Sequence, residues 1–423
     1  MNLHQFTTKH QWLSYLETLH LKTIDLGLER VNKVAARIGV RQFACPVILV
    51  AGTNGKGSTV GLLQAILASA GYRVGTYTSP HLLEFNERIQ FAGVPVSDHA
   101  LLEAFHYIEQ QRQEISLSHF EFTTLAAFHL FKQASLDVLI LEIGLGGRLD
   151  AVNCVAADLA IITSIDFDHM DYLGTTLEAI GAEKAGIIQA KKPCVYGDVT
   201  SIASITQRAQ ALESPLYQQA SDFHYQKQGK TWSWHNAQQR FEHLPLPTID
   251  LQNAATVLQA IDLLKSFFTI TRDHIEQGLN EVFIPGRFQI IQDSPQVILD
   301  VAHNPAGARC LTKRLKGENK PKKTHAVFAM LEDKDHQNTC APLIEMIDVW
   351  HVASLPTTPR GASAAQLTSM LRSLNKQVVY QQYSNPGIAY QNALSQLEPS
   401  DRVLVFGSFY TVAAVFVALQ QPV

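Results

Sequence analysis

A buried strand followed by a glycine-rich turn and a helix narrows the range of possible folds more than any other part of this sequence. The apolar run Pro46–Val50 is typical of a strand, and the turn after it, residues 51–58, reads AGTNGKGS. Helical apolar spacing begins at Thr59. Glycines let backbone N–H groups approach phosphates, a helix N-terminus favours anions, and the lysine neutralises charge. The segment therefore predicts a nucleotide triphosphate site in an α/β domain.

The turn departs from the general phosphate-loop pattern G-x-x-x-x-G-K-[ST]. That pattern would need glycine at Val50 and a hydroxyl residue at Gly57. The hydroxyls that could reach a magnesium ion are those of Ser58 and Thr59 instead. The segment could also be an ordinary glycine-rich turn, but the lysine inside it disfavours that interpretation.

Composition limits the class of protein. A chain of 423 residues with 17% charged residues and a net charge of −4 is expected to form two or three domains without a basic surface for nucleic acid. Its five cysteines are scattered, which disfavours a zinc site or a disulfide framework and fits a reducing compartment. No signal-peptide pattern and no apolar run of about 20 residues is present. We expect a cytoplasmic chain that binds neither nucleic acid nor membrane.

Strands and helices alternate along most of the chain, which predicts parallel sheets covered on both faces. The first 40 residues are predicted to be helical, and residues 221–248 to form hairpin strands. The Pro-Gly pair in residues 284–287 marks a boundary near residue 286, between domains 1–285 and 286–423. The strands expected in the first domain are Val47–Val50, Arg73–Tyr77, Val138–Leu141, Leu159–Thr163 and Pro193–Tyr196. Those expected in the second domain are Val297–Val301, Thr324–Met330, Val349–Ala353, Val378–Tyr383 and Val403–Phe406.

Polar residues follow several of these strands, at the sheet edge where α/β proteins bind ligands. Glu142 ends one strand and suits a magnesium ion, although it could be an ordinary strand-end acid. His169 could ligate a metal, or it could be a surface histidine. In the glycine-rich segment 143–150, Arg148 and Asp150 could contact a ligand or form a local ion pair. By itself, Lys184 is typical of a solvated residue.

The second domain repeats this arrangement. Asp300 and His303 follow a strand, where they could serve a ligand or a simple capped turn. Arg287 lies at the hinge, from which an arginine can reach a nucleotide and couple domain closure to chemistry. It could equally be a surface arginine.

Together these motifs resemble one family. The phosphate loop, Ser79-Pro80-His81, residues 141–150 (LEIGLGGRLD), 183–186 (EKAG), 285–288 (PGRF) and 300–305 (DVAHNP) are similar to the folylpolyglutamate synthase/dihydrofolate synthase family. This family is the folate branch of the Mur ligase superfamily. The resemblance implies a mostly parallel, ATP- and pterin-binding P-loop domain at 1–285. It also implies a smaller Rossmann-like glutamate-ligase domain at 286–423, in a monomer.

The resemblance also implies roles for individual residues. The implied ATP contacts are Thr53, Asn54, Gly55, Lys56, Gly57, Ser58, Asn253, Arg287 and Asp300. The implied metal ligands are Ser58, Ser79, Glu142 and His169. The implied pterin site is Asp25, Leu26, Phe120, Glu121, Leu149 and Asp150. The implied catalytic residues are Lys56, Lys184 and His303. Lys184 matches a lysine that is N6-carboxylated in the superfamily, where the resulting anion helps to hold a second Mg²⁺.

The implied reaction is ATP-dependent amide formation. ATP would phosphorylate a carboxylate of dihydropteroate or of a tetrahydrofolate polyglutamate, and L-glutamate would attack the acyl phosphate. The match at Phe120-Glu121 and Leu149-Asp150 favours a bifunctional enzyme over one that performs polyglutamation only. The phosphate loop would also suit a Mur enzyme acting on cell-wall precursors, or a nucleotide-gated switch protein. A simple switch has no need of the second domain.

Overall fold

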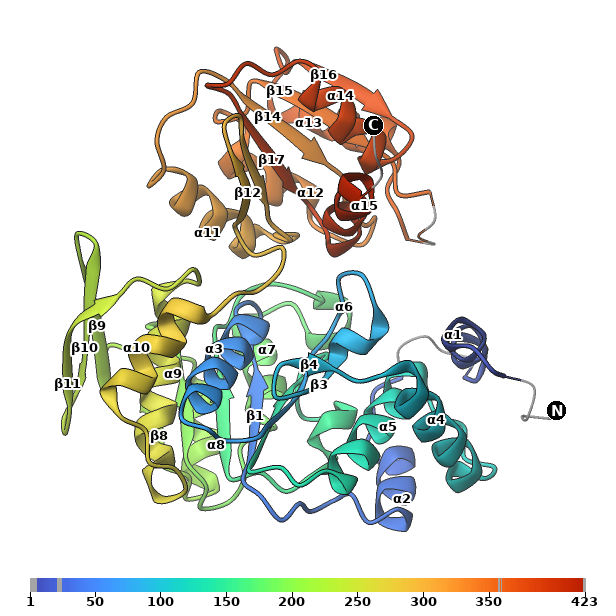
Figure 1. The fold of residues 1–423 in the computed structure, drawn as a ribbon, viewed down its shortest axis with the longest axis vertical. Helices are drawn as coiled ribbons and strands as arrows, with labels where there is room; N and C mark the ends of the chain where they lie inside the picture. Colours follow the sequence, from blue (N-terminus) through green and yellow to red (C-terminus); the bar gives the residue numbers. More distant parts are fainter. Residues whose placement is uncertain (1–5, 21–24, 357, 359, 421–423) are drawn as a thin grey trace. The chain divides into compact units, whose positions relative to one another are not determined.

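The computed structural model describes residues 6–20, 25–356, 358 and 360–420. The chain splits into two compact units, Met1–Phe283 and Ile284–Val423 (Figure 1). In the N-terminal region that the sequence predicts to be helical, the described helices are α1 (Lys9–Thr18) and α2 (Glu29–Arg37), and residues 1–5 and 21–24 lie outside the described part. Among the described residues, no helix is long and apolar enough to cross a membrane. All five cysteines are free, as their scattered positions predict.

The first unit is built on an eight-stranded sheet with the order β4-β3-β2-β5-β1-β6-β7-β8. Six of these strands are parallel, and the short β3 pairs antiparallel with β2 and β4. The strands are β1 (Val47–Ala51), β2 (Val74–Tyr77), β3 (Ile89–Phe91), β4 (Val94–Pro95), β5 (Val138–Glu142), β6 (Leu159–Ile162), β7 (Cys194–Tyr196) and β8 (Leu216–Gln218). The five expected strands of this domain are confirmed to within one residue at each end. The strands β3, β4 and β8 were not predicted, because they are short and only partly buried.

Helices cover both faces of this sheet. On one face α3 contacts β1, β2 and β5, and α9 contacts β6 and β7. The opposite face packs on α5, whose Phe122 and Phe128 share a buried cluster with Leu49 and Leu141. Successive strand residues point to opposite faces, so a strand buried on both faces is apolar throughout. The helices of this unit include α3 (Lys56–Ser69), α4 (Asp98–Arg112), α5 (His119–Gln133), α6 (Met170–Leu173), α7 (Leu177–Ala185), α8 (Ala203–Ala211), α9 (Leu251–Leu263) and α10 (Arg272–Glu281).

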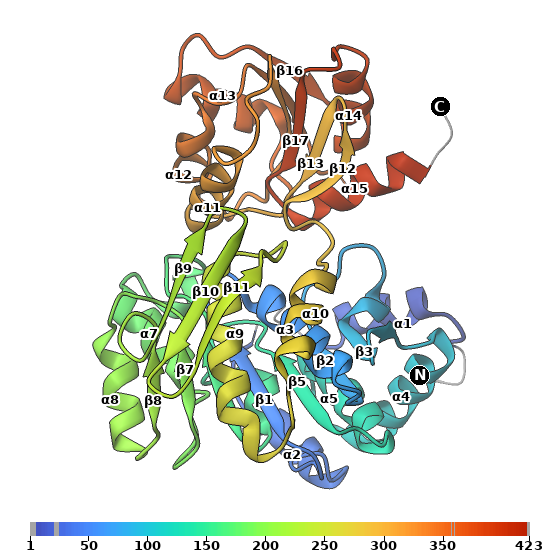
Figure 2. The same cartoon turned by 60° about the vertical axis from the view of Figure 1, so that its left-hand side comes forward.

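A small antiparallel sheet packs beside α9 and α10 (Figure 2). It has three strands, β9 (Phe223–Gln228), β10 (Thr231–Asn236) and β11 (Arg240–Pro245), where the sequence predicts hairpin strands.

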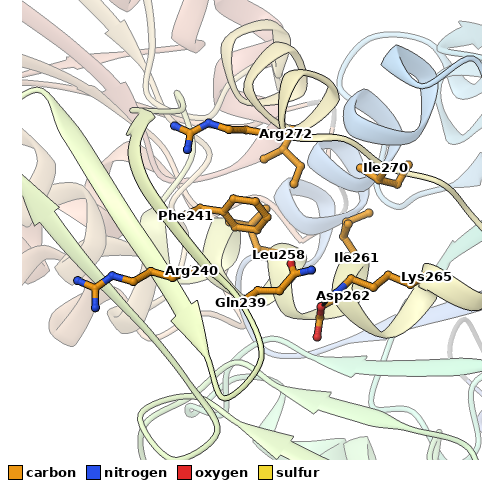
Figure 3. A pocket seen from close by; sticks show the side chains of 10 residues that line it. Gln239, Arg240, Phe241, Leu258, Ile261, Asp262, Lys265, Ile270 and Arg272 are labelled. Atoms are coloured by element: carbon orange, nitrogen blue, oxygen red, sulfur yellow. Dashed lines mark ion pairs between the residues drawn. The ribbon is translucent and has the colours of Figure 1, made fainter.

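A cavity of about 230 Å³ lies between this sheet and the two helices. Figure 3 shows Phe241, Leu258 and Ile261 turned toward it and Arg240 pointing away. Two cations on its rim are paired, Lys265 with Asp262 and Arg240 with the neighbouring Glu242.

The second unit contains a six-stranded sheet with the order β12-β13-β17-β14-β15-β16. Only β12 is antiparallel to its neighbour. The strands are β12 (Gln289–Asp293), β13 (Gln296–Leu299), β14 (Thr324–Phe328), β15 (Val349–Ala353), β16 (Tyr380–Tyr383) and β17 (Arg402–Phe406). Its helices are α11 (Pro305–Leu315), α12 (His336–Cys340), α13 (Ala364–Leu374), α14 (Pro386–Leu394) and α15 (Phe409–Gln420). All five strands expected here are present, and the edge strand β12 was not predicted.

Candidate functional site

Strand order brings the motifs of the first unit together. The strands β2, β5, β1 and β6 are neighbours and run in the same direction. Their carboxyl ends therefore lie along one edge of the sheet. The segments that follow them are residues 78–81, 143–150, 52–55 and 163–169, which are the motifs singled out in the sequence. The site is thus assembled at the edge where open α/β sheets bind ligands.

The phosphate loop is held by close contacts that only glycine permits. Gly52 has a φ of +147°, and a Cβ there would lie 1.8 Å from Thr163 Oγ1. The Thr163 hydroxyl donates to the Asn54 carbonyl at 2.6 Å. Gly55 has a φ of +87°, and a Cβ there would lie 2.3 Å from Asn253 Oδ1. Asn253, which comes from α9 about 200 residues further along the chain, therefore lies directly against the loop.

Two lysines converge on the same carbonyl. Lys56 Nζ donates to Gly52 O at 3.1 Å, and Lys184 Nζ donates to the same oxygen at 2.9 Å. Lys184 is only 4% exposed, so the interpretation of an isolated solvated lysine is wrong. Burial lowers the pKa of Lys184 to about 7, and repulsion from Lys56 adds to this, while Asp168 and Asp150 oppose it. A large share of Lys184 is therefore the neutral, nucleophilic amine near pH 7.

The predicted metal ligands are oxygen-rich. Glu142 is 4% exposed and accepts a hydrogen bond from the Ser79 backbone N–H at 3.3 Å. Its Oε2 would lie 3.8 Å from a Cβ at Gly57, so the carboxylate reaches the phosphate loop. His169 adopts a left-handed φ of 51° at the end of the loop after β6. No group of three or more His, Cys, Asp or Glu side chains is placed to hold a metal within the described part of the chain.

This donor set suits Mg²⁺, which is commonly held by one or two carboxylates together with phosphate oxygens and waters. Glu142 beside the phosphate loop meets that description.

The three segments predicted for the pterin site are also brought together. The Gly27 N–H donates to Leu149 O at 3.2 Å, which joins the stretch containing Asp25 and Leu26 to the one containing Leu149 and Asp150. The Phe120 ring lies against Gly144, where a Cβ would be 2.5 Å from Phe120 Cζ. In chain order, about 95 residues separate the first of these segments from the second, and about 30 separate the second from the third, so only the fold places them side by side.

Asp150 is a buried acid rather than half of a local ion pair. Its carboxylate accepts hydrogen bonds from the N–H groups of Leu145 at 2.7 Å and Val152 at 2.9 Å. Burial raises its pKa to about 6, although these N–H donors and Lys56 oppose the shift. Arg148 pairs with Glu183 instead, at 2.7 Å, so the local ion pair considered from the sequence is wrong.

In the second unit, Arg287, Asp300 and His303 gather near the carboxyl end of β13. The Arg287 guanidinium carbon lies 5.5 Å from the Phe409 ring centre. The His303 ring centre lies 6.1 Å from the same Phe409 ring centre. Asp300 accepts from the Phe288 and Ala302 N–H groups, both at 2.8 Å. Burial raises the pKa of Asp300, and Arg287 opposes this.

His303 has a defined tautomer when neutral. Its Nδ1 lies 2.8 Å from the Val301 carbonyl and donates to it, which leaves Nε2 as the accepting nitrogen.

Comparison with known proteins identifies the family of this chain. The model of the Mur ligase middle domain matches residues 50–261, and that of the Mur ligase glutamate ligase domain matches residues 286–409. The dihydrofolate synthase/folylpolyglutamate synthase of Escherichia coli (strain K12) is 46% identical over 404 residues, which cover 96% of this chain and 94% of that protein. The chain belongs to the dihydrofolate synthase/folylpolyglutamate synthase family.

Solved structures of this family are similar over almost the whole chain. The E. coli FolC complex with DHPP and ADP has a TM-score of 0.94 and 45% identity, and covers 98% of both chains. A bifunctional folylpolyglutamate synthase/dihydrofolate synthase with Mn, AMPPNP and L-glutamate bound has a TM-score of 0.92 and 44% identity, again covering 98% of both chains. This similarity confirms the Mur ligase architecture expected from the sequence.

The structure adds residues to the site of this family member that the sequence patterns did not indicate. Thr163 holds the phosphate loop, Phe409 lies close to both Arg287 and His303, and Arg30 joins two of the expected pterin residues. No local signal distinguishes Arg30 in the sequence, because its partner Glu121 lies on α5, about 90 residues further along the chain.

Proposed function

We propose that this member of the family ligates L-glutamate to dihydropteroate, forming dihydrofolate, and to folates, forming folylpolyglutamates. A carboxylate oxygen of the substrate attacks the γ-phosphorus of ATP, and ADP leaves. The amino group of glutamate then attacks the acyl phosphate, phosphate leaves, and the amine nitrogen loses a proton. The observation that carries the proposal is that the phosphate loop, which contains Lys56, lies beside Glu142 and belongs to the same sheet edge as the pterin segments. The chain is also similar throughout to one family member solved with ADP and to another solved with L-glutamate.

Lys56 and the loop amides are assigned to phosphoryl transfer. This reaction depends on positioning and on neutralising the charge that develops on the transferred group. Thr53, Asn54, Gly55, Gly57 and Ser58 provide the loop, and Asn253 lies against Gly55. Divalent metal, when bound, would bridge the phosphates and offset their charge, held by Glu142, Ser58, Ser79 and His169.

Lys184 is assigned as the N6-carboxylated lysine. With a pKa of about 7, about half of its buried nitrogen is the neutral amine near pH 7, which is the form that adds CO₂. The product is a carbamate anion, which could help hold a second Mg²⁺. Lys184→Glu should therefore retain more activity than Lys184→Ala, because glutamate restores a negative group. Equal activity in the two variants, at the wild-type level, would remove this role.

The pterin site is assigned to Asp25, Leu26, Phe120, Glu121, Leu149 and Asp150. Phe120 offers an aromatic face, and the acids offer acceptors for the N–H groups of the pterin ring. The test is ADP release with dihydropteroate, ATP and glutamate as substrates. Release only when a folate replaces dihydropteroate would identify an enzyme that performs polyglutamation alone, and no release with either would overturn the function.

In the second unit, Arg287 and Asp300 are assigned to the nucleotide and His303 to catalysis. In this proposal, residues 1–285 form the ATP- and pterin-binding domain, and residues 286–423 form the glutamate-ligase domain. Arg287 and His303 both lie close to the Phe409 ring, which supports the proposal that the two residues contact the same ligand. We further assign the working form as a cytoplasmic monomer without a nucleic-acid or membrane partner; sedimentation of the purified chain tests the monomer.

A further inference from the structure

One arginine connects two acids from distant parts of the chain. Arg30 lies in the first turn of α2, and its Nη1 is 2.5 Å from Asp25 Oδ2. Its Nη2 and Nε donate to Glu121 Oε2 at 3.2 Å and 3.3 Å. Nη2 also donates to the backbone carbonyl of Asp25 at 3.0 Å. A planar guanidinium can serve two acceptors at fixed angles in this way, whereas an ammonium offers a single point of charge.

Both acids are held from a second side. Glu121 is 4% exposed and accepts from the Ser118 N–H at 2.7 Å, as part of the capping box that starts α5. Asp25 Oδ2 is 3.1 Å from His20 Nε2, and His20 Nδ1 is 2.6 Å from Ser116 Oγ. A neutral His20 can satisfy both contacts when Nε2–H donates to Asp25 and the Ser116 hydroxyl donates to Nδ1.

Charge makes the arginine necessary for this arrangement. Two carboxylates share one guanidinium, so these three groups together carry one net negative charge. Glu121 is buried and Asp25 is 22% exposed, so without a cation the two carboxylates would repel each other, and Glu121 would also pay a desolvation cost. Removing Arg30 would therefore move the two acids apart.

The cluster borders the segments that are assigned to the pterin. Glu121 follows Phe120, whose ring lies against Gly144. Two residues after Asp25, the Gly27 N–H bonds to Leu149 O. A displacement of either acid would therefore shift a pterin segment.

We propose that Arg30 is a positioning residue for dihydropteroate, acting through Asp25 and Glu121. This proposal rests on the function proposed above. The carboxylates present acceptors to a ring edge that carries amino and ring N–H donors, and Arg30 sets their separation. A purely structural arginine would instead support the start of α5 and affect all substrates equally.

The experiment compares the full-length wild type with Arg30→Met, Arg30→Lys and Lys33→Met. Lys33 is the matched control, because it lies one turn further along α2 and pairs at the surface with Glu29. For each protein, KM and kcat are measured for dihydropteroate, ATP and glutamate, together with the melting temperature. We expect R30M to raise the KM for dihydropteroate about tenfold or more, with the KM for ATP within about twofold of wild type. R30K should fall between R30M and wild type, and K33M should match wild type.

A wild-type KM for dihydropteroate in R30M would overturn the proposal, as would an equal rise in all three KM values. If R30M does not fold, R30K decides, because lysine keeps the charge but has a single nitrogen, which cannot reproduce the separate contacts that Nε, Nη1 and Nη2 make with the two acids. A KM for dihydropteroate at least about threefold above wild type in R30K supports the proposal, and an unchanged value overturns it. If the wild type itself does not use dihydropteroate, the proposed function has failed rather than the role of Arg30.

Discussion

Replacing Lys184 with methionine is expected to stabilise the protein while abolishing its activity. Methionine has a similar length and shape but carries no charge. Folding places the Lys184 ammonium in a site that is 4% exposed and next to Lys56. Most substitutions of buried residues destabilise a protein, so a stabilising result is a distinctive expectation.

The magnitude follows from the two protonation equilibria. The pKa of Lys184 falls from 10.5 to about 7 on folding, so the unfolded chain binds more protons throughout that interval. Stability must therefore rise with pH between these values, and the residue costs about 4 kcal/mol at pH 7 and about 1 kcal/mol near pH 9.5. The hydrogen bond to Gly52 O offsets part of any gain, since it is lost in the variant and is worth about 1 to 3 kcal/mol. We expect a net gain of about 2 kcal/mol for K184M at pH 7.

Urea unfolding of the full chain at the two pH values measures this effect. The buffers are purged of CO₂, because N6-carboxylation would replace the ammonium with an anion. Lys192→Met is the control, since Lys192 is half-exposed and its pair with Asp158 is worth little. The advantage of K184M over wild type should shrink by about 3 kcal/mol between pH 7 and about pH 9.5. A K184M protein that is less stable than wild type at pH 7, with a difference that does not change with pH, would show that burial of Lys184 does not destabilise the fold.

Three further changes have defined outcomes. Gly52→Ala would place a Cβ 1.8 Å from Thr163 Oγ1, so ADP affinity measured by calorimetry should fall by about 100-fold or more, whereas Gly27→Ala, with open space around it, should leave it unchanged. Lys56→Ala should reduce kcat by about 1,000-fold or more while the protein remains folded by circular dichroism, and wild-type turnover would exclude its role at the phosphates. Burial lowers the pKa of His351 from 6.5 to about 4, so the stability linked to its neutral form is present above pH 6.5 and is lost as the pH falls toward 4. His351→Phe should therefore make urea unfolding of the second unit less sensitive to acid over that range, and an unchanged pH dependence would contradict this.

Local patterns in the sequence predicted most of the fold. Apolar runs separated by helical spacing located the expected strands of both sheets, because a strand buried on both faces must be apolar. The strands that were not predicted, such as β4 (Val94–Pro95) and β12 (Gln289–Asp293), lie at sheet edges and are partly exposed. Their side chains need not be apolar, so no pattern distinguishes them from loops.

The candidate site also has features that the sequence predicted and features that it did not. Short runs of neighbouring residues identified the phosphate loop and the polar residues at the strand ends, and the motifs taken together identified the family. The burial of Lys184 against Gly52, the contact of Asn253 with Gly55 and the link that Arg30 makes between Asp25 and Glu121 became visible only in the fold. Burial and long-range electrostatic contacts shift protonation and fix geometry, and they depend on which distant elements pack together. A one-dimensional pattern of residues carries no direct record of that packing.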